Sequence, residues 1–211
     1  MKKTILIFFS AISLASHSQE NLIGIKGGIS GNNILSRSTY FKDTKIQPNF
    51  SGGVTFEHRM KNHFSIGADL LYSRKGFRQK MTYYNSEGLM VSERATQNTF
   101  DYLNVPVMIG YHGGNKLSGF ARVGVAPAIL IKAENHHPVA GRTDVTKNYE
   151  KFDLSAVAEV GGDYRLKEKI LLFASVAYQH SVLGVVVQPL SNQIRAYHYG
   201  ATLSLGVKYA I

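Results

Sequence analysis

The stretch Tyr199-Gly-Ala-Thr-Leu-Ser-Leu-Gly-Val-Lys-Tyr-Ala-Ile211 at the end of the chain decides the fold. Every second residue, beginning with Tyr199, is apolar or aromatic, whereas the residues between them are small or polar. Such strict alternation is the pattern of a β-strand whose two faces lie in different environments. The stretch is thirteen residues long, whereas strands of about five or six residues are usual in soluble sheets. We therefore expect a strand that is long enough to cross the hydrocarbon layer of a membrane.

The same alternation recurs along the 211-residue chain and predicts eight strands. They cover residues 22–30, 48–59, 63–78, 98–112, 118–132, 152–166, 169–181 and 197–211. Short polar turns are expected at 60–62, 113–116 and 166–168, and long polar loops at 31–47, 79–97, 133–151 and 182–196. Alternating short and long connections are typical of outer-membrane barrels, whose periplasmic turns are short. The sequence therefore predicts an all-β fold, an eight-stranded antiparallel up-and-down transmembrane β-barrel with both termini on the periplasmic side.

The polarity of the two strand faces favours a membrane barrel over a soluble one. A soluble barrel places its large apolar side chains inside, but eight strands leave an interior only just wide enough for side chains to fill. Here one face carries the bulky apolar residues and the other carries mostly Gly, Ser, Thr and single charges. The bulky face therefore points to lipid. Tyrosines near the strand ends on this face are expected to form an aromatic girdle: Tyr72, Tyr111, Tyr164, Tyr178, Tyr199 and Tyr209.

The N-terminus has the features of a secretory signal peptide. Lys2 and Lys3 precede an apolar run at residues 5–12, and small residues at 16 and 18 favour cleavage before Gln19. The alternative is a membrane anchor, but the run is much shorter than the roughly 20 residues that a spanning helix needs. We therefore expect a signal peptide at 1–18 and a barrel domain at 19–211. Because the chain has no cysteine, it has no disulfide, catalytic thiol or lipoprotein anchor.

Charged residues also lie on the small, inward-facing side of the predicted strands. Both signs occur, on several different strands, and isolated charges in a narrow lumen would be costly, so we expect them to pair across it. The favoured interpretation is a structural plug of ion pairs, and the alternative is a gated path for ions or solutes. The predicted lumen charges are Lys26, Glu57, Asp69, Arg122, Asp153, Glu159, Asp163 and Lys208.

No motif predicts a catalytic centre, a cofactor site or a metal site. Glu159 and Asp163 lie four residues apart without a nucleophile nearby, and the adjacent pair His136 and His137 lies in a predicted loop. His180-Ser181 would suggest an outer-membrane acyl hydrolase only if it lay close to Glu159, and no hydrolase motif surrounds it. Three classes of function stay open: a structural or loop-mediated binding role, which ranks first, a narrow porin-like channel, and a lipid-modifying enzyme.

The basic excess of the chain points to lipid rather than to nucleic acid. The formal net charge is +10, from 24 Lys and Arg against 14 Asp and Glu. The cations are scattered through loops and turns instead of gathering on one face, unlike a nucleic-acid footprint. Those near the external rim are expected to contact outer-membrane lipid and the phosphates of lipopolysaccharide: Lys42, Lys45, Arg74, Lys75, Arg78, Lys80 and Arg94.

Three segments resemble a known family. Gly24-Ile-Lys-Gly-Gly28, Tyr102-Leu-Asn-Val-Pro-Val-Met-Ile-Gly-Tyr111 and Leu205-Gly-Val-Lys-Tyr-Ala-Ile211 are similar to the PorT-like outer-membrane β-barrel domain of Bacteroidetes-type, Gram-negative bacteria. The resemblance implies an exported outer-membrane barrel without assigning a particular role. The last eight residues also resemble the signal that barrel-assembly machinery reads, which makes this machinery an expected partner. The residues that carry this signal are Ser204, Gly206, Tyr209 and Ile211.

Overall fold

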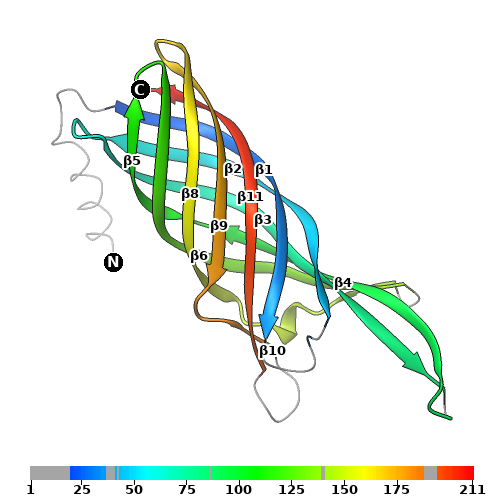
Figure 1. Ribbon diagram of the computed structural model, residues 1–211. Coiled ribbons are helices and arrows are strands. Elements are labelled where there is room, and N and C mark those ends of the chain that lie inside the picture. The colour runs from blue at the N-terminus through cyan, green and yellow to red at the C-terminus, as the bar shows by residue number, and fades with distance from the viewer. Residues whose placement is uncertain (1–19, 37–40, 42, 86, 139–140, 188–193) are drawn as a thin grey trace, which may run out of the picture.

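The computed structural model describes residues 20–36, 41, 43–85, 87–138, 141–187 and 194–211. The expected signal peptide, residues 1–18, lies outside this part of the chain. Within it, antiparallel strands form a closed ring (Figure 1). The strands of the ring are β1 (Glu20–Ser36), β2 (Thr44–Arg59), β3 (Phe64–Tyr84), β4 (Met90–Asn104), β5 (Val107–Gly114), β6 (Leu117–His137), β8 (Phe152–Lys167), β9 (Ile170–Ser181) and β11 (Ile194–Ala210).

The ring closes where the first strand pairs with the last. β1 pairs with β11 from Leu22 opposite Ala210 to Ser36 opposite Ala196. Each remaining strand pairs with its predecessor in the order β1, β2, β3, β4, β6, β8, β9, β11, and β5 continues the position of β4 between β3 and β6. With β4 and β5 counted as one, eight strands surround the lumen, which confirms the predicted eight-stranded up-and-down barrel.

The fourth predicted strand, 98–112, is not continuous. β4 ends at Asn104 and β5 begins at Val107, because Pro106 lies between them. Proline has no backbone N–H to donate to the ladder. Its carbonyl still accepts a bond from the N–H of Asp69 at 3.0 Å, and Val105 donates to the carbonyl of Pro127 at 2.9 Å. The wall of the barrel therefore stays connected across the break.

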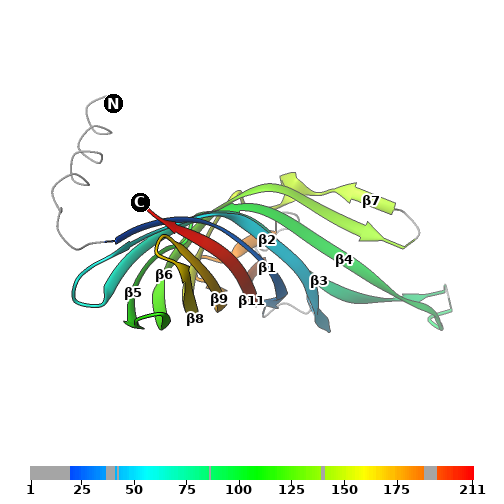
Figure 2. The same cartoon turned by 90° about the horizontal axis from the view of Figure 1, so that it is seen from above.

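The predicted long loops contain more strand than the sequence pattern indicates. Most of the predicted loop 79–97 is a two-stranded ribbon, formed by the ends of β3 and β4, that extends past the barrel wall (Figures 1 and 2). The loop 133–151 includes the end of β6, β7 (Gly141–Asp144) and the short helix η3 (Thr146–Asn148). In 182–196 lie β10 (Val185–Val187) and the start of β11. Backbone hydrogen bonds between neighbouring segments of the chain extend these strands into regions where apolar and polar residues do not alternate.

The outer face of the barrel is apolar, as the alternation predicts. Along β6 the outward side chains Leu117, Val123 and Ile131 are 72%, 56% and 55% exposed, while most residues of the alternate, inward parity from Ser118 to Leu130 are buried. The six predicted girdle tyrosines lie on the outer face, half-buried or exposed. In two of them a lysine ammonium lies 5.7 Å from the centre of the tyrosine ring: Lys116 over Tyr164 and Lys169 over Tyr209. In the described chain, no helix is both long and apolar enough to cross a membrane.

Candidate functional site

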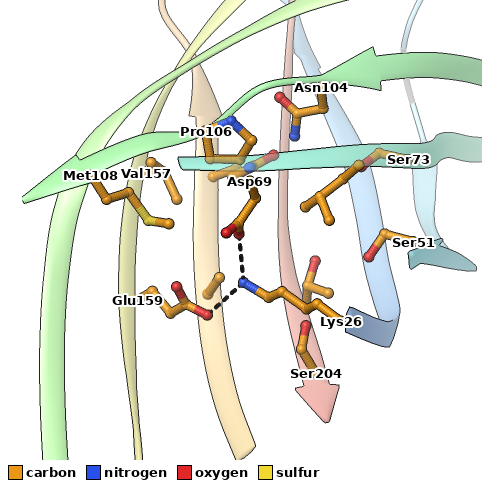
Figure 3. A pocket seen from close by; sticks show the side chains of 14 residues that line it. Lys26, Ser51, Asp69, Ser73, Asn104, Pro106, Met108, Val157, Glu159 and Ser204 are labelled. Carbon is orange, nitrogen blue, oxygen red and sulfur yellow. Dashed lines mark hydrogen bonds and ion pairs between the residues drawn. The ribbon is translucent and has the colours of Figure 1, made fainter. Parts of the chain in front are cut away.

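The inner face of the barrel carries a network of buried ion pairs. Arg122 on β6 lies directly opposite Glu159 on β8, and their side chains are 3.0 Å apart. Lys26 on β1 donates to the carboxylates of Glu159 at 2.7 Å and Asp69 at 3.0 Å (Figure 3). Thr55, the β2 neighbour of Asp69 in the ladder, donates its hydroxyl to the same carboxylate at 2.6 Å. Side chains from five strands therefore meet at one level of the lumen.

The network continues toward the short turns. Lys208 on β11 donates to Glu57 on β2 at 2.7 Å and to Asp163 on β8 at 3.0 Å. Arg59 donates to Glu57 through Nε at 2.9 Å and also bonds to Asp163. The guanidinium of Arg122 lies 3.6 Å from Glu57 and so connects the two levels. Seven of the eight predicted lumen charges lie in this one connected cluster, to which Arg59 belongs as well, whereas Asp153 pairs with Lys75 outside it.

The sequence prediction is wrong about Lys75. It is assigned above to the external rim, but its side chain is buried in the lumen, 3.0 Å from Asp153. The hydroxyl of Ser181 donates to the other oxygen of Asp153 at 2.6 Å. The physical reason is the period of the strand: Lys75 is six residues after Asp69, and β3 runs unbroken between them, so both point inward.

Positive and negative charges in the lumen are equal in number. Arg59 was missed by the sequence analysis because it borders a turn, although it follows Glu57 by two residues and so shares its face. Among the described residues, five buried cations and five buried anions face the lumen: Lys26, Arg59, Lys75, Arg122, Lys208, Glu57, Asp69, Asp153, Glu159 and Asp163.

Above the network, the lumen holds a cavity of about 30 Å³, lined in part by Ser51, Ser73, Asn104 and Met108 (Figure 3). A water molecule occupies about 30 Å³ in the liquid and needs two to four polar partners. The hydroxyl and amide groups around the cavity supply such partners. The space therefore suits about one ordered water and is far too small for a solute.

Toward the long loops the lumen is filled by apolar side chains, which the sequence analysis did not predict. Phe77 and Phe100 stack at 6.1 Å, and His198 meets the edge of Phe100 at 4.9 Å. His198 is buried, and neither of its ring nitrogens has a hydrogen-bond partner in the described structure. The buried members of this apolar cluster are Ile34, Phe41, Phe77, Phe100, Tyr102, Ala128, Leu130, Ala133 and Ala196.

The groups considered for catalysis or metal binding are separated by the strand geometry. His180 contacts Tyr178 and Tyr199 on the outer face, whereas Ser181 is buried in the lumen on Asp153. His136 and His137 lie at the end of β6 and not in a loop, so the prediction of a loop there is wrong. Within the described residues, no group of three or more His, Cys, Asp or Glu could hold a metal ion.

The basic residues of the external rim differ in their surroundings. Lys45, Arg78, Lys80 and Arg94 are exposed, and Lys42 lies outside the described residues. Arg74 donates to both carboxylate oxygens of Asp101, at 2.7 and 3.0 Å. At the end of β7, hydrogen bonds from Thr146 lower the pKa of Asp144, so these hydrogen bonds are present at neutral pH and are lost on acidification.

The C-terminal signal residues are divided between the two faces of β11. Ser204 is buried, and Tyr209 and Ile211 are exposed on the outside. Gly206 faces inward, where a Cβ would come within 2.5 Å of the ring of Phe173. The missing side chain therefore makes room for the aromatic ring that covers the Lys208 ammonium at 4.6 Å.

A closed eight-stranded barrel with an apolar belt and an ion-paired lumen is the architecture of small outer-membrane proteins. Residues 16–182 match the family described as outer membrane protein beta-barrel domain, and the chain belongs to this family. The protein is therefore located in the outer membrane. No curated protein matches the sequence.

Two solved structures share the fold. The outer membrane protein OprG from Pseudomonas aeruginosa is 14% identical, with a TM-score of 0.51 over 93% of this chain and 98% of that chain. Neisserial surface protein A, NspA, is 12% identical, with a TM-score of 0.50 over 89% of this chain and 96% of that chain. At this level of identity the likeness concerns the fold alone.

Proposed function

We propose that the protein is a closed barrel that acts by binding through its extracellular loops and rim, without conducting solutes and without catalysing a reaction. The observation that carries this proposal is the balanced lumen, in which five buried cations face five buried anions. A hydrated pore does not require such compensation, because water solvates its charges. In a narrow, dry lumen each charge needs a partner.

The two halves of the lumen support the same conclusion. The ion-pair network fills the half near the short turns, and the apolar cluster fills the half near the long loops. A separate ion pair, Lys75 with Asp153, borders the apolar cluster, since the Lys75 ammonium lies 4.9 Å from the centre of the Tyr102 ring. An ion would have to displace paired charges and then cross an apolar constriction, and both steps are unfavourable.

The extracellular end offers the surface for binding. The ribbon of β3 and β4 projects past the wall (Figure 1), and its turn exposes Leu89, Met90 and Val91. We further propose that the exposed rim cations contact lipopolysaccharide and that barrel-assembly machinery reads the C-terminal strand. We also propose that the protein is a PorT-like barrel, from the resemblance of the three segments named above. We propose further that it is exported by a signal peptide cleaved near Ser18.

Conductance in planar lipid bilayers tests the closed lumen. The purified, refolded protein is expected to give no current above that of the bare bilayer, and Lys80→Ala, a variant of an exposed rim residue, serves as the matched control. A steady current with ion selectivity that changes in Arg122→Ala would overturn the proposal in favour of a narrow channel. Lipid mass spectrometry after incubation with outer-membrane lipids tests catalysis, and modified lipid would refute the binding role.

A further inference from the structure

The wall of the barrel is irregular between β2 and β3, at the external rim. The two strands pair from Arg59 to Ser51 and again from Ile46 to Thr44, with a register shift in between. Residues 47–50 of β2 therefore face only residues 74–76 of β3. Pro48 lies in this segment and has no N–H to donate to a ladder. β-bulges of this kind redirect side chains at the rims of barrels.

A pocket of about 320 Å³ lies at this irregularity. Its walls come from β2, β3, β4, β6 and β7, and they include Gln47, Phe50, Arg74, Thr99, His136 and Arg142. The volume lies at the lower end of the range of ligand sites, about 300 to 1,000 Å³. It suits one ring-sized ligand, whereas the 30 Å³ cavity of the lumen does not.

One wall of the pocket holds a buried, unsatisfied acceptor. Gln47 is only 6% exposed, and its Oε1 has no hydrogen-bond partner in the described structure. Its Nε2 is engaged, at 3.4 Å from the hydroxyl of Thr99 and 3.5 Å from the side-chain oxygen of Asn49. A buried acceptor without a donor destabilises the fold. A hydroxyl group of a ligand would satisfy it.

Other lining residues supply positive charge and a flat apolar surface, and the carboxylate of Glu134, which also lines the pocket, is already paired with Lys132 at 2.7 Å. Arg142 is exposed and has no ion-pair partner among the described residues, and His136 is its neighbour in the β6–β7 ladder. Arg74 is held in place by Asp101 and lies 5.2 Å from the centre of the Phe50 ring. A free guanidinium selects an anionic group, while an aromatic ring can pack against the apolar face of a sugar.

We propose that this pocket binds an acidic sugar, with its carboxylate or phosphate on Arg142 and His136 and a hydroxyl donating to Gln47. The inference rests on the binding role proposed above and names its ligand class. Two sources present this chemistry: the headgroup of an outer-leaflet glycolipid, and a free saccharide in the medium. The contact of Phe50 with Tyr72 at 5.9 Å on the outer face places the pocket directly beside the lipid belt.

Binding measurements on the refolded protein test the pocket. Glucuronate and glucose, followed by isothermal titration calorimetry, serve as acidic and neutral free sugars. Vesicles with and without lipopolysaccharide serve as the glycolipid. We expect Arg142→Ala and Gln47→Leu each to weaken binding about tenfold, since a hydrogen bond to a charged or buried partner contributes about 1.4 kcal/mol or more. Lys61→Ala, which removes an exposed cation at the short turn between β2 and β3, away from the pocket, is the matched control and should leave the affinity unchanged.

Glucuronate binding that both pocket variants weaken supports the site with a free saccharide as its source. Binding of lipopolysaccharide vesicles alone, with the same dependence on the variants, supports it with a glycolipid as its source. The proposal is overturned if neither glucuronate nor lipopolysaccharide vesicles bind, or if Lys61→Ala loses as much affinity as Arg142→Ala. Bilayer conductance of the same preparations distinguishes the two proposals. If the protein conducts ions but still binds the sugar, only the proposal of a closed lumen is refuted.

Discussion

The ammonium of Lys208 lies 2.7 Å from a carboxylate oxygen of Glu57, although the two residues are 151 positions apart in the chain. Lys208 is on β11 and Glu57 on β2, and β1 lies between these strands in the ring. The ion pair therefore spans the seam at which the barrel closes. It links the closure of the wall to the neutralisation of the lumen.

Replacing Arg122 by Ala should destabilise the barrel strongly. Arg122 forms ion pairs with Glu159 and Glu57, and its removal leaves these buried carboxylates with one cation fewer. The expected loss in the free energy of unfolding is about 3–5 kcal/mol, measured by urea unfolding in lipid vesicles. Lys80→Ala, which removes an exposed pair with Glu93, should cost less than about 1 kcal/mol. Equal effects of the two substitutions would indicate a hydrated lumen.

A second test concerns the separate ion pair of Lys75 and Asp153, which borders the apolar cluster. Lys75→Met should destabilise the protein by about 3–5 kcal/mol, because it leaves Asp153 buried with only the hydroxyl of Ser181. Combining it with Asp153→Asn removes the unpaired charge and should recover much of the loss. A double-mutant cycle on the same unfolding assay measures this coupling. Additive effects of the two changes would contradict the pairing.

The position of the lipid belt can be tested by placing charges on β6. Val123 is in the middle of the outward row and Leu117 is its first residue. Val123→Arg should reduce stability by about 2–4 kcal/mol, and Leu117→Arg by at most about 1 kcal/mol, because the cost of a charge depends on its depth in the bilayer. Vesicle-based unfolding of both variants provides the comparison. A smaller effect at Val123 than at Leu117 would be incompatible with the belt described above.

Removing residues 209–211 should strongly reduce insertion into the outer membrane. The truncation deletes the outward-facing Tyr209 and Ile211, and it also removes the bond from the N–H of Ile211 to the carbonyl of Asn21 at 2.9 Å. The folded barrel is detected in membrane fractions by its heat-modifiable migration on gels. Ile211→Phe, which keeps the outward apolar character of the end, should insert normally. Unchanged insertion of the truncated chain would show that the signal lies elsewhere.

Period-two alternation was sufficient to predict the number of strands, their direction and the inward position of Lys26, Glu57 and Asp69. The prediction failed where we did not apply the alternation as far as the end of a strand. Lys75 and Arg59 lie on the same faces as Asp69 and Glu57, but Lys75 was assigned to the rim by its nearness to a loop, and Arg59, which borders a turn, was overlooked. The apolar cluster around Phe77 and Phe100 could not be predicted, because alternation does not distinguish an aromatic ring in a lumen from one that faces lipid.

The closure of β1 on β11 has a consequence for the biogenesis of the protein. Glu57 and Asp163 are synthesised long before Lys208, which arrives only three residues before the end of the chain. A prematurely terminated polypeptide would contain both acids without this cation, next to a β1 edge with no final strand. Only a chain that includes β11 places the Lys208 ammonium between these two carboxylates. The same strand therefore closes the wall and completes the charge balance, so that a chain without β11 would lack both.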